Sequence, residues 1–537
     1  MISSTHATPR SRGPRLRLAG LLAAAFMIIA APNVSAANAV NINVQLPAGY
    51  SIAGTIRNAA GAVLPGAQVI GIATNGFGFA STDSTGKYKM QGLVAGAYQV
   101  LVYAPSGVNL VDGYYTTANA NHFTTSSASA TKVTVSPSKT GIDVKLPTGY
   151  TVAGTIQTTG GAALAGVSVS IVGPSSDSAI TDAAGKYTLK GLGAGSYKLA
   201  LSGPSNSSYL RGWYSTANAN HFVLSPASAS ALTLGPSKTG VNAKIPTGYS
   251  ISGKITNAAG GALAYAGVGA SSSSYSNSTS ADASGNYTIK GLAAGTYKLS
   301  ITAPSNTISM DGYYTSANAN HFTSSAAGAT GVAVGPSKTG VNVKVANGWS
   351  ISGMVTTTTG TPLQDAYVSA NSGGHYRTAY TDAAGKYTLK GLNSGAQTLS
   401  VEPPYNMNYQ GGFYTTANSN HFTPAAASAV AITVGPSKTG INIKLPTAYT
   451  ISGKITGPGA VALSGASVYA SASNGAGYAS TIANGTYKII GLVAGTYKIS
   501  VSPPYTSPTL QSGYYTTVGT SHFTSVPGSA SGVHVGP

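Results

Sequence analysis

Apolar and polar residues alternate over several stretches of the chain. The alternation lasts from Tyr249 to Thr256 and is also present in Val241–Ile245. A period of two is typical of a strand with one buried and one solvated face. A turn sequence at 257–261 separates the longer stretch from a small-residue strand at 262–270, and a variable loop rich in Ser, Tyr and Gly follows. We therefore expect short strands joined by tight turns.

The most regular segment, Thr181–Leu201, predicts a hairpin. Asp182 can accept hydrogen bonds from the backbone two residues on, and Gly185 can take the positive φ that closes the turn. Tyr187 and Leu189 then share one face of a strand. The glycines at 191–195 allow the chain to reverse, and a second strand returns from there to the end of the segment.

Two phrases repeat along the chain with one period and define five units. The aromatic of "PTGYS" recurs every 99 or 100 residues, and the histidine of "NHF" or "SHF" recurs every 99 to 101 residues. The first set is Tyr50, Tyr150, Tyr249, Trp349 and Tyr449, and the second is His122, His221, His321, His421 and His522. With 69 glycines, 27 prolines and no useful helical period, each unit reads as an all-β sandwich. The predicted fold is a tandem array of five Ig-like or transthyretin-like β-sandwiches after a signal peptide.

The unit boundaries follow from the strand "NINVQLP", which stands before the first "GYS". We interpret this strand, and its copies in the connectors, as opening a unit. The predicted sandwich repeats are therefore 37–138, 139–237, 238–337, 338–437 and 438–537, after a signal peptide at 1–36. Short joints containing proline should limit bending between neighbours, so we expect a monomeric, semi-rigid rod.

Residues 1–36 have the features of an export signal. Four arginines precede the apolar run Leu18–Ala31, and Val34-Ser35-Ala36 has the small-x-small form of a cleavage site. The run is too short to cross a bilayer stably. We expect a secreted, cell-surface or periplasmic protein without a membrane span after cleavage, the alternative being an uncleaved N-terminal anchor.

Cysteine and charge counts narrow the classes of partner. The chain has no cysteine, so disulfides and thiolate metal sites are excluded. Without the four leader arginines, 25 basic and 10 acidic side chains leave a net charge of +15. Spread over five units this charge is too dilute for a nucleic-acid-binding face. It favours acidic surfaces or polymers instead.

The phrases "TD..GKYTLKGL.AGTYKLS", "G.I....G..L.GA.V" and "TGVNVKLPTGYSISGKIT" resemble the carboxypeptidase regulatory-like domain family, five times over residues 37–537. The resemblance implies a transthyretin-like or starch-binding-like β-sandwich. Domains of this kind accompany exported enzymes, receptors and adhesins as folding aids, spacers or binding modules. The resemblance therefore implies a fold and no activity.

Candidate catalytic and metal-binding residues are few. The ten acidic residues include a single glutamate, Glu402. Four aspartates occupy one turn position, where the fifth unit has Ile482, and this substitution suits a turn rather than a ligand: Asp83, Asp182, Asp282 and Asp382. Zinc needs three or four converging ligands, whereas the marker phrase offers one histidine per unit. We expect no catalytic residue, no metal and no cofactor, and a loop-tying role for the histidines.

One aromatic pair per unit, followed by Asn and Thr residues, is the most suggestive surface feature. The pairs are Tyr114-Tyr115, Trp213-Tyr214, Tyr313-Tyr314, Phe413-Tyr414 and Tyr514-Tyr515. Successive strand residues face opposite ways, so one ring can enter the core while the other stays outside. The outer ring either stacks on a sugar or packs across a unit junction. If the protein binds sugar, replacing the second ring of each pair by Ala is expected to abolish that binding.

These features predict an exported, non-catalytic spacer or adhesin-like surface or matrix module. Its partner would be a polysaccharide or another surface protein. The alternatives are a carbohydrate-binding protein and an accessory part of a secreted hydrolase system.

Overall fold

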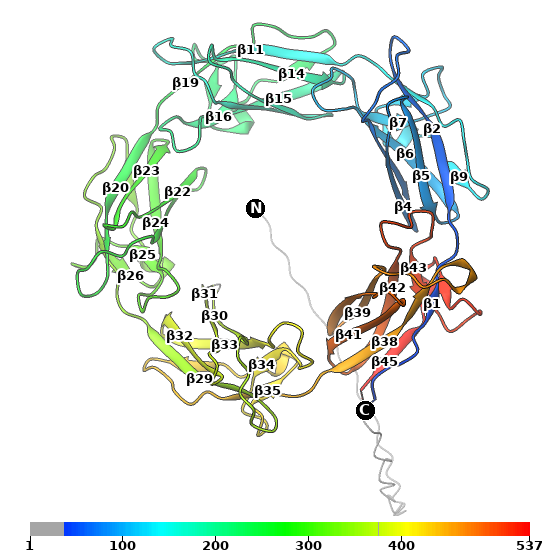
Figure 1. Cartoon of the computed structure of the whole chain (residues 1–537). Coiled ribbons are helices and arrows are strands. Elements are labelled where there is room, and N and C mark those ends of the chain that lie inside the picture. Colours follow the sequence, from blue (N-terminus) through cyan, green and yellow to red (C-terminus); the bar gives the residue numbers. More distant parts are fainter. Residues whose placement is uncertain (1–36, 374, 537) are drawn as a thin grey trace, which may run out of the picture.

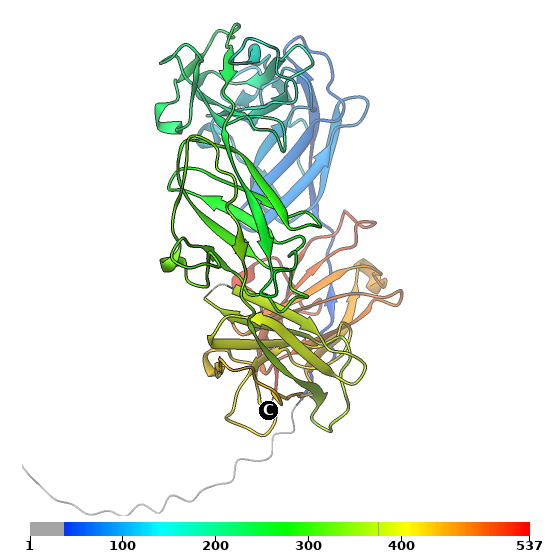
Figure 2. The same cartoon turned by 90° about the vertical axis from the view of Figure 1, so that its left-hand side faces the viewer.

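Five β-sandwiches form a closed ring in the computed structural model, which describes residues 37–373 and 375–536 (Figure 1). Figure 2 views the ring from the side, with the third unit in front. Within the described ranges the only helical elements are short 3₁₀ turns, and no helix there is long and apolar enough to cross a bilayer. The all-β prediction is confirmed. The predicted signal peptide, 1–36, lies outside the described residues.

The first unit contains two sheets. Its three-stranded sheet has the order β10-β2-β5, and its six-stranded sheet has the order β4-β3-β6-β7-β8, with β9 pairing β6. The elements are β2 (Tyr50–Asn58), β3 (Gln68–Ala73), β4 (Gly76–Ser81), β5 (Lys87–Leu93), β6 (Gly96–Tyr103), β7 (Gly113–Tyr115), β8 (Phe123–Thr124), η1 (Ser127–Ser129), β9 (Val133–Val135) and β10 (Val144–Leu146).

The other units repeat this plan. The second has β11 (Tyr150–Thr158), β12 (Ser168–Val172), β13 (Asp177–Ile180), β14 (Lys186–Leu192), β15 (Gly195–Ser202), β16 (Arg211–Tyr214), β17 (Phe222–Val223), η2 (Pro226–Ser228), β18 (Leu232–Leu234) and β19 (Ala243–Ile245). The third has β20 (Tyr249–Thr256), β21 (Gly267–Ser271), β22 (Ser276–Ser280), β23 (Asn286–Leu292), β24 (Gly295–Thr302), β25 (Gly312–Tyr314), β26 (Phe322–Thr323), η3 (Ala326–Gly328), β27 (Val332–Val334) and β28 (Val343–Lys344).

The fourth unit has β29 (Trp349–Thr357), β30 (Tyr367–Ser372), β31 (His375–Tyr380), β32 (Lys386–Leu392), β33 (Gly395–Glu402), β34 (Gly412–Tyr414), β35 (Phe422–Thr423), η4 (Ala426–Ser428), β36 (Ile432–Val434) and β37 (Ile443–Leu445). The fifth has β38 (Tyr449–Thr456), η5 (Pro458–Ala460), β39 (Ser467–Ala472), β40 (Gly475–Ser480), β41 (Thr486–Leu492), β42 (Gly495–Ser502), β43 (Gly513–Tyr515), β44 (Phe523–Thr524), η6 (Pro527–Ser529) and β45 (Gly532–Val535). Its three-stranded sheet is completed by β1 (Val44–Gln45).

The alternation predicted from the sequence matches the burial of side chains. In β14, Tyr187 and Leu189 are buried, and Lys186 and Thr188, which alternate with them, face solvent. The variable segment expected as a loop in the third unit is instead strand β22, which pairs with β21 at the edge of the six-stranded sheet. Its Ser- and Asn-rich sequence lacks an apolar face because an edge strand here covers little of the core.

The connector strands close the preceding unit, which corrects the predicted boundaries. β10 runs parallel to β2 with Val144 opposite Ile56, and β19, β28 and β37 pair with β11, β20 and β29 in the same way. Parallel pairing needs a long crossover, and the rest of the sandwich supplies it. By pairing, the units are 48–147, 148–246, 247–346, 347–446, and 447–536 together with 37–47.

A glycine in each long strand permits this pairing. A Cβ built on Gly154 would lie 2.0 Å from the carbonyl oxygen of Val241 in the connector. Gly54, Gly253, Gly353 and Gly453 make the same close approach to their connectors. Beside this contact, the buried Tyr187 hydroxyl donates to that same Val241 carbonyl at 2.7 Å. Each connector therefore packs directly against the backbone of the long strand, at a glycine that has no side chain.

The ring is closed by residues 37–47, which we call the clasp. Within it, β1 pairs parallel with β38 of the fifth unit, Val44 opposite Ile455, and Ala37 forms an antiparallel bridge with Gly536. The rod predicted from the sequence is therefore wrong. Short joints do hold neighbours at fixed angles, but those angles bring the fifth unit back to the first (Figure 1).

Replacing Gly154 by Ala should lower the free energy of unfolding by about 2 to 4 kcal/mol, because the connector must move away from the new methyl group. Gly160→Ala is the matched control, since the nearest atom to its Cβ is 3.7 Å away. It should change stability by less than about 0.5 kcal/mol. Equal effects of the two substitutions in thermal and urea unfolding would contradict the close-approach argument.

Candidate binding face

The second aromatic of each pair belongs to the core side of the six-stranded sheet. Tyr115, Tyr214 and Tyr414 are each 8% exposed, and Tyr314 and Tyr515 are partly buried. Each ring stacks on the histidine of its own unit, with centroids 5.7 to 6.0 Å apart. The second rings are therefore packing residues, and the expectation that they are the rings that contact a sugar is corrected.

The histidines tie a loop to the sheet. His221 has a φ of +49°, and its Nδ1 lies 3.2 Å from the carbonyl oxygen of Ser215, to which it donates as the Nδ1-protonated tautomer. The other four make the same contact at 3.1 to 3.2 Å. Within the described ranges no three His, Asp or Glu side chains are grouped as metal ligands. The loop-tying role predicted for the histidines agrees with this geometry.

A glycine before each pair makes room for this packing. A Cβ on Gly212 would lie 2.3 Å from the carbonyl oxygen of Val223 and 2.5 Å from the ring of Phe222. Equivalent contacts surround Gly113, Gly312, Gly412 and Gly513. The phenylalanine of the marker phrase thus covers the glycine, and this places the two following rings on opposite faces of the strand.

The first aromatic of each pair lies half-buried on the opposite, outer face of the same sheet: Tyr114, Trp213, Tyr313, Phe413 and Tyr514. Small residues flank several of these rings across the sheet. Trp213 is opposite Ala200, which is opposite Ser170. In Figure 1 the long strands of the three-stranded sheets, such as β11, β20 and β29, lie toward the outside of the ring, and strands of the six-stranded sheets, such as β16, β24 and β33, lie nearer its centre. The five first aromatics therefore share the inward-directed face.

Trp213 lines a hollow of about 250 Å³ at the junction of the second and third units. Arg211 and Tyr275 line it too, and the guanidinium carbon of Arg211 lies 4.8 Å from the centroid of the Tyr275 ring. The backbone N–H of Arg211 donates to the Tyr275 hydroxyl at 2.9 Å. A neighbouring hollow of about 440 Å³ adds Lys290 and several hydroxyl side chains. Rings, hydroxyls and two cations suit a hydroxylated, acidic ligand.

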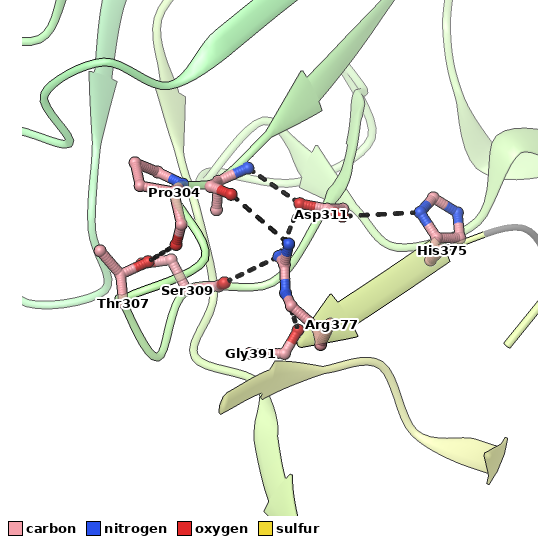
Figure 3. A network of polar contacts seen from close by, with 8 residues as sticks. Pro304, Thr307, Ser309, Asp311, His375, Arg377 and Gly391 are labelled. Atoms are coloured by element: carbon pink, nitrogen blue, oxygen red, sulfur yellow. Dashed lines mark hydrogen bonds and ion pairs between the residues drawn. The ribbon is translucent and has the colours of Figure 1, made fainter. Parts of the chain in front are cut away.

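The junction of the third and fourth units is fastened by a buried ion pair (Figure 3). Arg377 of β31 donates to the Asp311 carboxylate at 2.6 Å, and both side chains are nearly inaccessible to solvent. The guanidinium also reaches the carbonyl oxygens of Ser309 and Gly391, and His375 Nδ1 lies 3.7 Å from Asp311. The contacts with Asp311 and Ser309 join the two units, whereas the bond to Gly391 lies within the fourth unit and fixes the guanidinium in place.

The turn aspartates are occupied by their own backbone. Asp282 Oδ1 accepts from the N–H groups of Ser284 and Asn286, both at 2.9 Å. These bonds favour the carboxylate, so the backbone N–H of Asn286, above all, lowers the pKa of Asp282. In the fifth unit Asn484 accepts from Thr486 instead. The structural turn role predicted for this position is confirmed by these contacts.

Sequence reasoning missed the inter-unit side chains. Arg211, Tyr275 and Arg377 each occur in one unit only, and Asp311 has an equivalent only in Asp112 of the first unit, so no phrase repeated in all five units marks them. Their partners lie in the neighbouring unit, more than 60 residues away. The one available signal was the departure of single units from the repeat.

The repeated sandwich and its two faces define the chain as a tandem array of small β-sandwich domains. The model of the carboxypeptidase regulatory-like domain matches residues 151–233, 250–343 and 350–446, which is just over half of the chain. The chain belongs to the carboxypeptidase regulatory-like domain family, as its sequence predicted. The first and fifth units lie outside the matched residues and share the same strand register.

Solved structures give weaker similarities. The chain is 12% identical to the Streptococcal ancillary pilin, with 56% of this chain and 99% of that chain covered and a TM-score of 0.23. The chain is 13% identical to the Bacillus anthracis TIE protein, with 74% of this chain and 69% of that chain covered and a TM-score of 0.16. It is 10% identical to BcpA, the major pilin subunit of Bacillus cereus, with 56% of this chain and 99% of that chain covered and a TM-score of 0.14. No curated protein matches the chain.

Replacing Tyr214 by Ala should destabilise the second unit by about 3 to 5 kcal/mol, since a large core ring is lost. Trp213→Ala, one residue earlier, should cost only about 1 kcal/mol because its ring is half exposed. Chemical unfolding of the two variants side by side measures the difference. A larger loss for Trp213→Ala would reverse the assignment of faces.

Removing Asp311 should be far more costly than removing both partners of its ion pair. Asp311→Ala leaves the Arg377 guanidinium buried without its carboxylate, which costs about 3 to 5 kcal/mol. Adding Arg377→Met should restore part of that loss. A double-mutant cycle from unfolding free energies measures the coupling, and additive effects would show that the pair does not hold the junction.

Proposed function

We propose that this protein is an exported, non-catalytic adhesin-like or structural module of the cell surface or matrix, which holds a partner through weak contacts repeated around the ring. The observation that supports the proposal is one half-buried aromatic ring per unit on the face directed toward the ring centre. Five equivalent weak contacts made by one rigid body give an avidity far above that of a single site. The spacer role is not proposed again, because a ring does not extend along a line.

A carbohydrate partner is the second candidate. It is favoured by the hollow at Trp213, where an aromatic ring lies beside Arg211 and Tyr275. An aromatic face stacks on the C–H face of a sugar, and a guanidinium binds a carboxylate or sulfate group. The net positive charge of the chain also favours an acidic polysaccharide as the partner.

One binding experiment tests both candidates. The labelled protein is added to whole cells or isolated matrix of its own organism, and saturable binding is expected. Substituting the five first aromatics by Ala should abolish this binding, and single substitutions should weaken it in steps. Tyr505→Ala is the control, because Tyr505 is a fully exposed ring outside the sheet face. Binding unchanged by the fivefold substitution would overturn the proposal.

Treating the matrix with periodate or with protease distinguishes a polysaccharide partner from a protein partner. Periodate, which cleaves sugar diols, should abolish binding if the partner is a polysaccharide, and protease should do so if it is a protein. In native gels, a polyuronate should retard the protein more than a neutral glucan does, and Trp213→Ala should reduce that retardation. Equal mobility in both gels would exclude the acidic-carbohydrate candidate.

A further inference from the structure

The clasp is bound to the fifth unit by noncovalent contacts alone. Ile42, Val44 and Leu46 of the clasp are 9%, 2% and 0% exposed, and they belong to the hydrophobic core of the fifth unit. Without them, β38 would have an unpaired edge and that core would be open to water. The clasp is therefore a structural part of the fifth unit, although more than 400 residues separate the two in the chain.

Hydrogen bonds join the clasp to the fifth unit along its whole length. The N–H groups of Ala39, Ile42 and Leu46 donate to Thr450, Ser452 and Thr456 at 2.7 to 3.0 Å. The hydroxyl of Tyr487 in the fifth unit donates to the Ile42 carbonyl at 2.8 Å. The side chains of Asn38 and Asn43 accept from the backbone of β38. These are backbone-directed contacts, which any identical strand would make.

The covalent connectors make the same contacts one hundred residues later. Tyr88 donates to Ile142 in the first unit as Tyr487 does to Ile42 in the fifth. Asn41 has a φ of +60°, where the connector has Gly141 at +72°. Ala48 bridges to Leu510 as Thr148 bridges to Leu110. The junction made by the clasp is thus geometrically equivalent to junctions made along the chain.

The clasp differs from the connectors in charge. Ala39 and Gln45 stand where the first connector has Lys139 and Lys145. The three later connectors also have lysine at both positions. Lysines on a strand edge discourage pairing with other chains. The clasp is therefore the one copy of this strand that lacks that protection.

We propose that the clasp also joins copies of the protein: residues 37–47 of one copy complete the fifth unit of a second, which opens both rings into a linear assembly. The contacts are the same whether the strand comes from the same copy or another, as in domain swapping and strand addition. The choice depends on concentration. The closed ring dominates when the protein concentration is below the effective concentration of its own clasp.

Paired thiols report which copy supplies the clasp. The chain has no cysteine, so Ala48→Cys with Leu510→Cys creates a single pair at the ring closure. Refolding from denaturant under oxidising conditions at about 1 μM should give a disulfide within one copy. At about 1 mM, the order of effective concentrations for linked modules, it should give disulfide-linked dimers and larger species on a non-reducing gel.

Thr148→Cys with Leu110→Cys is the matched control, because that bridge joins neighbouring units of one chain. It should give monomers at both concentrations. Adding Val44→Asp to the test pair should remove the links at both concentrations, whereas Val144→Asp, at the equivalent position, should leave them. Monomers alone from the test pair at about 1 mM, or equal ladders from test and control pairs, would overturn the proposal.

Discussion

Each of the first four sandwiches is completed by a strand that follows all its other strands in the chain, and the fifth is completed by β1, which precedes them all. The completing strand lies parallel to the first long strand of its unit. It packs against a glycine of that strand, Gly154 or one of its four equivalents, at which there is no room for a side chain. The pairing holds the unit closed and fixes the start of the next one a few residues later. The orientation of every neighbour, and through it the curvature of the whole array, depends on this contact.

Because the array is curved into a ring, the two sheets of each unit lie on different sides of it. The three-stranded sheets face outward, and the six-stranded sheets bring one aromatic ring per unit toward a common centre (Figure 1). The unique side chains at single junctions, such as Arg377 with Asp311, hold neighbouring units in place around this face.

Local features of the fold could be predicted from the sequence because local physics determines them. The alternation around Tyr187 and the turn at Asp182 depend on residues close in sequence, and both are present as expected. The direction in which the connector strand pairs is not local. A strand before the first unit fits an opening role equally well, and only its contact with β38 shows that it completes the last unit. The same limitation applies to the aromatic pairs, because alternation places the two side chains on opposite faces of the strand without indicating which face is buried.

The bridge between Ala37 and Gly536 brings the two ends of the described chain together. A circle has no preferred starting point, so the same five sandwiches could be encoded beginning at any connector, with the former ends joined by a short loop. Such permuted genes would each place the break in a different unit. Comparing their folding would show whether all five units tolerate a separate completing strand equally well or whether the fifth unit tolerates it best.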